Sequence, residues 1–186
     1  IVDLEPTLSL PLDETYCLNT PTEASRTLTL PISGANTSVV SCFGANTYGN
    51  VACIATGTID HVQNTVKITF TLQNQKADTF RIIGSAGGLG SCAGNTDKFE
   101  IIFNPLPDLT IINSNPNGCD PVTTDLAAVI NNAIDPATSD YSWTATNSTT
   151  ATSTNSTVSN TFSGANGDIT LTVTSLDGCS STITDN

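Results

Sequence analysis

Six cysteines are the residues best placed for chemistry, and their spacing favours disulfide bonds over a metal site. They are Cys17, Cys42, Cys53, Cys92, Cys119 and Cys179. The chain has no CxxC pair, and its only histidine is His61. Zinc sites need clustered cysteine and histidine ligands. Cysteines without such clusters predict disulfides, and disulfides predict an oxidising, extracellular compartment.

The second half of the chain holds two cysteines, which we expect to be bonded to each other. Cys119 precedes the second expected strand of that half, and Cys179 opens the last one. The loop closed by a Cys119–Cys179 bond would constrain the unfolded chain.

The first half holds four cysteines, which allow three connectivities. By analogy with the second half, we expect a bond between Cys17 and Cys92. We expect Cys42 and Cys53 to pair across adjacent strands.

Catalytic chemistry has little support in the sequence. His61 lies beside Asp60, and serines are available at Ser33, Ser41 and Ser85, but no GxSxG motif surrounds a serine. Without a framed nucleophile and base, we expect no enzyme and no catalytic residues. His61 is interpreted as a turn residue.

A glycine-rich stretch and a set of acidic residues are the candidates for ligand binding in the sequence. The stretch GSAGGLG, residues 84–90, lacks the lysine and the following helix of a phosphate loop, so we expect a hairpin turn. The acidic residues near the expected domain ends are Asp13, Glu14, Asp108, Asp120 and Asp125. Their oxygens could converge on calcium, although no DxDxDG loop is present. The expectation is no cofactor, with calcium as the alternative.

The charge of the chain excludes several classes of partner. The formal net charge is -12, with only five Lys+Arg, which leaves no basic patch. Nucleic acid and anionic lipid surfaces are therefore not expected partners. No run of 18 apolar residues is present, so no membrane insertion is expected. The chain starts at Ile1, inside what reads as a linker, and is interpreted as a monomeric segment of a longer exported protein.

Composition and periodicity predict an all-β fold. The chain contains 32 Thr and 18 Asn, which favour strands and turns respectively. Residues 65–72 and 169–174 alternate apolar with polar residues, the period of a half-buried strand. Trp143 is expected to pack between two sheets, with sugar stacking beside Tyr141 as the alternative.

Two copies of one β unit account for the order of strands. Residues 77–104 and 167–186 both run from an Asp-led strand through a glycine turn and a cysteine into a last strand. Pro105 and Pro107 mark the boundary between the copies. The sequence predicts two tandem immunoglobulin-like β-sandwich domains, residues 1–104 and 105–186, placed end to end.

Three stretches carry a resemblance to a known class of protein. LPDLTI from Leu106, YSWTAT from Tyr141 and GDITLTVTSLDGCSSTIT from Gly167 resemble the Ig-like and PKD-like repeats of large Bacteroidota surface adhesins. The gliding-motility adhesin exported by the type IX secretion system is a member of that class. The resemblance covers residues 106–186 well and residues 1–105 loosely.

The resemblance implies a structural and adhesive segment of a long filament on a bacterial cell surface. Its partners would be neighbouring repeats of the same chain, and a surface polysaccharide or substratum. The alternative is a carbohydrate-binding module of a secreted glycoside hydrolase, which three aligned aromatic residues would favour. A third reading is a eukaryotic receptor ectodomain, because Asn36, Asn147 and Asn155 lie in N-x-S/T sequons.

Overall fold

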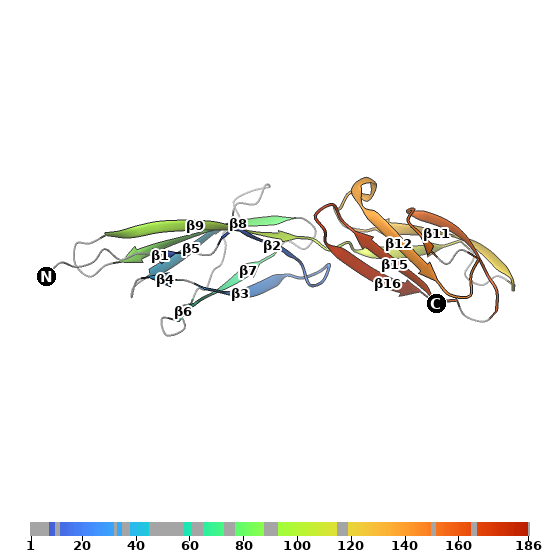
Figure 1. Ribbon diagram of the computed structural model, residues 1–186, viewed down its shortest axis with the longest axis horizontal. Coiled ribbons are helices and arrows are strands. Elements are labelled where there is room, and N and C mark those ends of the chain that lie inside the picture. Colours follow the sequence, from blue (N-terminus) through green and yellow to red (C-terminus); the bar gives the residue numbers. More distant parts are fainter. Residues whose placement is uncertain are drawn as a thin grey trace. The chain divides into compact units, whose positions relative to one another are not determined.

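The computed structural model describes residues 8–9, 12–31, 33–34, 38–44, 58–60, 65–72, 77–87, 93–114, 119–149, 152–164 and 167–185. Within these ranges the chain forms strands and one short 3-10 helix, and it has no α-helix (Figure 1). None of the described residues forms a helix long and apolar enough to cross a membrane.

The chain divides into two compact units. Unit 1 comprises Ile1–Cys17 and Thr22–Asn104, and unit 2 comprises Leu18–Pro21 and Pro105–Asn186. The segment Leu18–Pro21, here called the strap, therefore belongs to unit 2 although it lies within the first half of the sequence. Leu18 is buried.

In its described residues, unit 1 has a four-stranded sheet in the order β2-β9-β8-β5, a three-stranded sheet in the order β3-β7-β6, and the short pair β1-β4. Its strands are β1 (Leu8–Ser9), β2 (Glu14–Cys17), β3 (Ser25–Pro31), β4 (Ser33–Gly34), β5 (Ser38–Gly44), β6 (Thr58–Asp60), β7 (Thr65–Thr71), β8 (Asp78–Gly87) and β9 (Ala93–Asn104). Strand β2 runs parallel to β9, and the other pairs are antiparallel.

The core of unit 1 follows from the alternation along its strands. Val66, Ile68 and Phe70 of β7 are completely buried, as the period of two predicts. The Phe70 ring contacts the rings of Phe80 and Phe103 at centroid distances of 5.1 and 5.2 Å. Tilted aromatic contacts of this kind hold the two sheets together.

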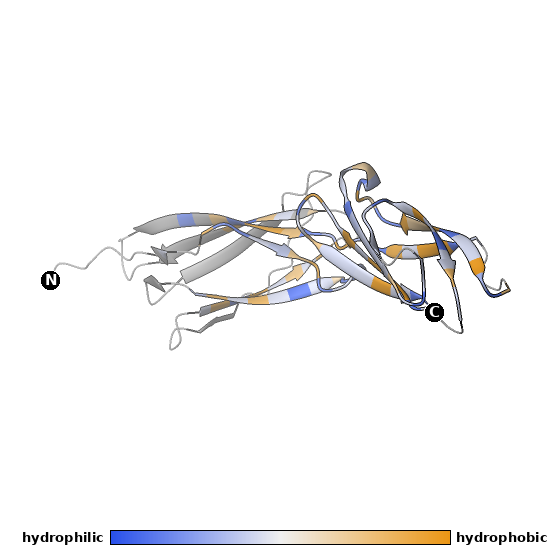
Figure 2. Ribbon diagram, turned by 45° about the vertical axis from the view of Figure 1, so that its right-hand side comes forward, coloured by the Kyte–Doolittle hydropathy of each residue, from blue (hydrophilic) through white to orange (hydrophobic). Residues whose placement is uncertain are grey.

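Unit 2 is a sandwich of a three-stranded sheet, β10-β11-β14, and a four-stranded sheet, β13-β12-β15-β16. Its elements are β10 (Leu109–Asn113), β11 (Val122–Ile130), η1 (Pro136–Thr138), β12 (Asp140–Ala145), β13 (Thr152–Ser153), β14 (Thr157–Phe162), β15 (Ile169–Thr174) and β16 (Ser180–Asp185). Figure 2 shows hydrophobic and hydrophilic residues alternating along strands of the sandwich.

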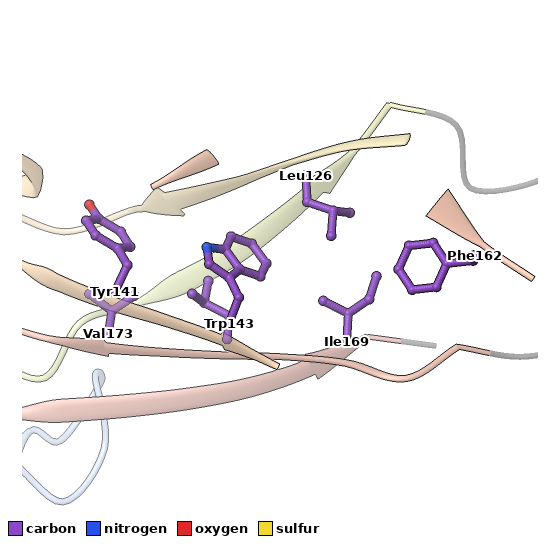
Figure 3. Packing of buried hydrophobic residues seen from close by; sticks show 7 residues of the cluster. Leu126, Tyr141, Trp143, Phe162, Ile169 and Val173 are labelled. Carbon is purple, nitrogen blue, oxygen red and sulfur yellow. The ribbon is translucent and has the colours of Figure 1, made fainter. Parts of the chain in front are cut away.

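The inward side chains of unit 2 meet between its two sheets (Figure 3). Trp143 is buried there, and its indole N–H donates to the carbonyl of Asn155 at 2.7 Å. Tyr141 points the same way, and its hydroxyl donates to the carbonyl of Pro136 at 3.1 Å. The predicted packing role of Trp143 is confirmed.

The strand order assigns the fold class without reference to any other protein. In unit 2 the first, second and fifth strands form one sheet, and the third, sixth and seventh lie together in the other. That division is the immunoglobulin pattern, in which the fourth strand joins either sheet. Here β13 pairs with β12. The predicted all-β, immunoglobulin-like sandwich class is confirmed.

Gly167 lies where the chain passes close to the core of unit 2. A Cβ atom at this position would come within 2.4 Å of the Phe162 ring and 2.9 Å of the Thr146 carbonyl oxygen. We expect Gly167→Ala to destabilise unit 2 by about 1–3 kcal/mol, because the Phe162 ring must leave its packed position. Denaturant unfolding followed by fluorescence of Trp143, the only tryptophan, measures this unit specifically.

Gly178→Asn is the matched control for this substitution. Gly178 has a φ of +81°, which Asn tolerates, and nothing lies within 4 Å of a Cβ there. An unfolding midpoint that falls equally in both variants would show that steric contact at Phe162 is not the cause.

Candidate functional site

The best-defined chemical feature of the described residues is disulfide bonding at Cys17 and at Cys179. Cys17 ends β2, in register with Asn104, the last residue of β9. Cys179 is completely buried and lies in the turn between β15 and β16. The Ser175 N–H donates to the Cys179 carbonyl at 2.9 Å, which closes this turn.

The predicted Cys119–Cys179 bond is wrong. Cys119 is a free, exposed thiol in the connection from β10 to β11. That connection lies at the end of unit 2 where the Gly164 N–H donates to the Asp120 carboxylate, whereas Cys179 lies at the other end of the six-residue strand β15. Such a strand spans about 20 Å, and bonded cysteines need Cα atoms within about 7 Å.

The predicted Cys17–Cys92 bond stays a prediction, and Cys17 is disulfide-bonded. The parallel register of β2 and β9 places Cys17 opposite Asn104, at the far end of β9 from Ala93. Cys92 itself lies outside the described residues. The predicted Cys42–Cys53 bond stays a prediction: Cys42 lies in β5, and Cys53 is also outside the described residues.

A cluster around Arg26, which we did not predict from the sequence, holds the backbone at Cys17. Arg26 donates to the Cys17 carbonyl at 2.8 Å and forms an ion pair with Glu23. Its guanidinium lies 5.3 Å from the centroid of the Phe103 ring. The three-residue spacing of Glu23 and Arg26 was the only indication of the ion pair in the sequence. Such a spacing is common, and it does not indicate that Arg26 also binds the Cys17 carbonyl. The cluster fixes the backbone of Cys17, which is disulfide-bonded.

Tyr16 and Glu14 lie next to this cluster on β2. The Tyr16 hydroxyl donates to the Glu14 carboxylate, and the Tyr16 ring stacks on Phe103 at 5.7 Å. The hydrogen bond to Glu14, followed by burial, raises the pKa of Tyr16 to about 12. In unit 2, burial raises the pKa of Tyr141, with a smaller contribution from Asp135.

Side chains of some of the acidic residues proposed for calcium accept local hydrogen bonds. Asp13 accepts from the Glu100 N–H at 2.7 Å, and Asp120 accepts from the Gly164 N–H at 3.0 Å. Asp108 and Asp120 lie at opposite ends of unit 2, and Asp125 is exposed on β11. Among the residues that the structure describes, no three His, Cys, Asp or Glu side chains are grouped so as to hold a metal.

The remaining candidates for chemistry are dispersed. Ser33 lies in β4, Ser41 in β5 and Ser85 in β8, and His61 is outside the described residues. The glycine-rich stretch predicted as a turn continues β8 as strand through Gly87, with a shift of register between Ser85 and Gly87. Small side chains allow such a bulge. Residues 88–90 lie outside the described part.

Threonine and serine side chains pair across the strands of unit 2. Thr172 and Thr182 hydroxyls are 2.8 Å apart, and Thr174 and Ser180 hydroxyls are 2.7 Å apart. Cross-strand hydroxyl pairs of this kind stabilise a solvated sheet face by a few tenths of a kcal/mol to about 1 kcal/mol. The high threonine content therefore has a structural explanation on this sheet.

Two of the three sequon asparagines lie in the described part of the chain, both on connections of unit 2. Asn155 is exposed between β13 and β14, and its carbonyl accepts from Trp143. Asn147 is exposed, with a φ of 52°. Asn36 is outside the described residues.

Comparison with solved structures gives immunoglobulin-type matches at low similarity. A titin structure, domains A168–A170, is 12% identical with a TM-score of 0.45 over all of this chain and 66% of its own. The N-terminal four Ig domains of Dscam1 isoform 4.4 are 13% identical with a TM-score of 0.45 over all of this chain and 46% of their own. The fibronectin(III)-like modules of Clostridium thermocellum CbhA are 8% identical with a TM-score of 0.37, over 95% of this chain and 90% of their own.

No protein-family model matches the chain, and no curated protein matches its sequence. The present chain spans less than two thirds of the titin and Dscam1 fragments. These TM-scores are too low to assign the fold class. The assignment to the immunoglobulin-like class depends on the strand order of unit 2. An immunoglobulin-like fold and a disulfide are typical of extracellular structural and binding domains.

The hydrogen-bonded pair of Tyr16 and Glu14 predicts that the free energy of unfolding depends on pH in alkaline solution. The ordinary tyrosine pKa is about 10, and the folded value is about 12. Unfolding therefore releases a proton between these values, so the free energy of unfolding should fall as pH rises from 10 to 12. Below pH 10 this contribution is constant.

Tyrosinate absorbance measures the pKa of Tyr16 in the folded chain. Denaturant unfolding at a series of pH values measures the free energy of unfolding. Tyr16→Phe should remove this titration from the folded chain and flatten the alkaline loss of stability. Glu14→Gln is the informative companion, because it keeps the phenol and removes the carboxylate acceptor, and should lower the Tyr16 pKa. A wild-type Tyr16 that ionises near pH 10 would refute the assignment.

Proposed function

We propose that this chain is a non-catalytic, load-bearing spacer within a long extracellular adhesive protein, of the kind that forms filaments on bacterial cell surfaces. The partners would be neighbouring repeats of the same chain, and a polysaccharide or substratum contacted elsewhere along the filament. The gliding-motility type of adhesin is the specific form that the sequence resemblance supports.

The observation that carries this proposal is the path of the chain through unit 2. The chain enters at Leu109, opposite Ile130, and its last described strand ends at Asp185, opposite Ile169. Seven strands that alternate in direction place these two points at opposite ends of the sandwich. A domain with opposite termini adds length to a filament with each repeat, whereas adjacent termini would make it a side branch.

The residues between the units support a spacer as well. Pro105 and Pro107 are buried, and Asn132 donates its side-chain N–H to the Leu106 carbonyl at 2.6 Å. The Asn131 N–H donates to the Asp108 carbonyl at 2.7 Å. The connection is therefore an ordered part of unit 2 and not a free linker.

The alternative function, a carbohydrate-binding module, lacks its best candidate for a sugar-binding surface in unit 2. Sugar-binding platforms present aromatic faces to solvent, but Trp143 and Tyr141 are both buried in the core. A pull-down with insoluble polysaccharides addresses the rival directly. Retention of the chain, abolished by free oligosaccharide, would favour a binding module over a spacer.

Small-angle scattering of the purified chain tests the spacer. Two sandwiches placed end to end should give a longest dimension on the order of 70 to 90 Å, since strands of six to ten residues span about 20–33 Å before turns are added. A compact particle with a radius of gyration of roughly 16 Å for this length would mean that the units lie side by side. The proposal would then lose its physical basis.

A further inference from the structure

We propose that Asn155 of unit 2 is the acceptor of an N-linked glycan, and that this glycan covers an open edge of the sandwich. The inference goes beyond the proposed spacer, because it assigns a covalent modification to one residue. The observations that carry it all lie within unit 2. Asn155 is followed by Ser156 and Thr157, which complete an N-x-S/T sequon.

The sequon at Asn155 presents its reacting groups to solvent. Asn155, Ser156 and Thr157 are exposed, at the connection from β13 to β14. Within the described part of the chain, neither the Asn155 side-chain amide nor the Thr157 hydroxyl takes part in a hydrogen bond. The backbone is held instead, since the Trp143 indole N–H donates to the Asn155 carbonyl at 2.7 Å. A connection fixed through its backbone leaves the asparagine side chain accessible to an enzyme.

The other described sequon of unit 2 begins at Asn147 and is bonded differently. The Thr149 hydroxyl donates to the Asn160 side-chain oxygen at 3.3 Å and accepts from the Thr161 N–H at 3.2 Å. The Asn147 carbonyl accepts from the Ser163 N–H at 3.0 Å. These bonds join the sequon to β14, so the folded unit withholds the Thr149 hydroxyl from a transferase. Asn147 therefore serves as an internal comparison for Asn155.

Transfer of the glycan requires a lipid-linked oligosaccharide diphosphate as co-reactant. The Asn155 Nδ2 atom forms a bond to C1 of the first sugar, and the bond from C1 to the diphosphate oxygen breaks. The diphosphate leaves with the electron pair of that bond, and the amide loses one proton to a base of the transferase. An exported chain meets such a donor at the membrane that it crosses, and export is typical of disulfide-bonded domains of this fold.

The position of Asn155 gives the glycan a physical role. Asn155 lies between β13 and β14, and among the described residues each of these strands is at the edge of its sheet. The Ala128 N–H donates to the Ser156 carbonyl at 2.9 Å. Hydrogen-bonded positions alternate along an antiparallel pair. Thr157 and Ser159 therefore direct their backbone N–H and C=O groups away from β11.

The open part of this edge begins beside the sequon. Further along β14, the Thr161 carbonyl accepts from the Thr149 N–H at 2.9 Å, which covers that part of the edge. Among the described strands, none pairs with β14 at Thr157 or Ser159 on the side away from β11. Open edges allow pairing with the edge of another molecule. A glycan on Asn155 would obstruct such pairing, which is an advantage where similar repeats lie close together.

Glycopeptide mapping tests the acceptor. The chain isolated from its own host should carry a glycan at Asn155, and an amidase that releases N-linked glycans should convert this residue to aspartate. Thr157→Ala should abolish the modification, whereas Thr157→Ser should retain it, because the sequon accepts either hydroxyl. An exported chain with an unmodified Asn155 would overturn the proposal.

Transfer to the purified chain tests whether the structure selects between the two sequons. The folded chain is supplied with an oligosaccharyltransferase and a lipid-linked oligosaccharide diphosphate. Asn155 should be modified in the folded chain, and Asn147 only after unfolding. Equal modification of the two residues in the folded chain would contradict the argument from the Thr149 hydrogen bonds.

Self-association tests the role of the glycan at the edge. Asn155→Gln keeps the bond from Trp143, which binds a backbone carbonyl, and the fluorescence of Trp143 checks the fold. All proteins carry Cys119→Ser, because the free thiol would otherwise allow disulfide-linked dimers. At equal concentration the Asn155→Gln variant should sediment as larger species than the glycosylated chain.

Ser159→Pro is the matched variant for this measurement. It removes one outward backbone N–H at an edge position, where proline is tolerated. Added to Asn155→Gln, it should return the chain to a monomer. An Asn155→Gln chain that is already monomeric would refute the role at the edge, and association that persists with Ser159→Pro would show that another surface is responsible.

Discussion

Packing of two sheets across one thin apolar layer is the interaction on which each unit depends. A single sheet leaves one face of apolar side chains in water, and only the second sheet removes that face. In unit 2 the layer consists of buried side chains from both sheets, with Trp143 and Leu171 among them. Each large side chain buried in this way contributes about 1.5–3 kcal/mol before the cost of ordering it. The strand alternation, the turns and the short connections all serve to bring these two faces together.

The polar groups of the buried aromatic residues are hydrogen-bonded, which allows these residues to lie within a thin apolar layer. The indole N–H of Trp143 and the hydroxyl of Tyr141 each donate to a backbone carbonyl at the rim of the core. On the solvent side, threonine pairs such as Thr172 and Thr182 bond to each other across strands. Burying the two aromatic residues without those acceptors would cost about 1–3 kcal/mol each. The composition, poor in aromatics and rich in threonine, is thus consistent with the sandwich that it forms.

Local pattern was enough to predict the strands and the fold class, because burial acts on every second residue. The strand over residues 65–71, the core position of Trp143 and the proline boundary before Leu109 all depend on neighbours in sequence. The cysteine pairing depended on long-range geometry, and the predicted Cys119–Cys179 bond was wrong. The strap and the Arg26 cluster were missed for the same reason, since no local pattern indicates that Leu18 belongs to unit 2 or that Arg26 binds the Cys17 carbonyl.

Part of the error could have been avoided by counting strands. In a sandwich of alternating strands, connections that follow odd strands lie at one end and those that follow even strands lie at the other. Cys119 follows the first strand of unit 2 and Cys179 follows the sixth, so the two belong to opposite ends. The partner of Cys179 must instead lie at the end where the chain enters unit 2. Parity therefore excludes Cys119 as the partner of Cys179, in agreement with its free thiol. A cysteine pairing within a sandwich can be tested from sequence in this way only after the strands between the two cysteines have been counted.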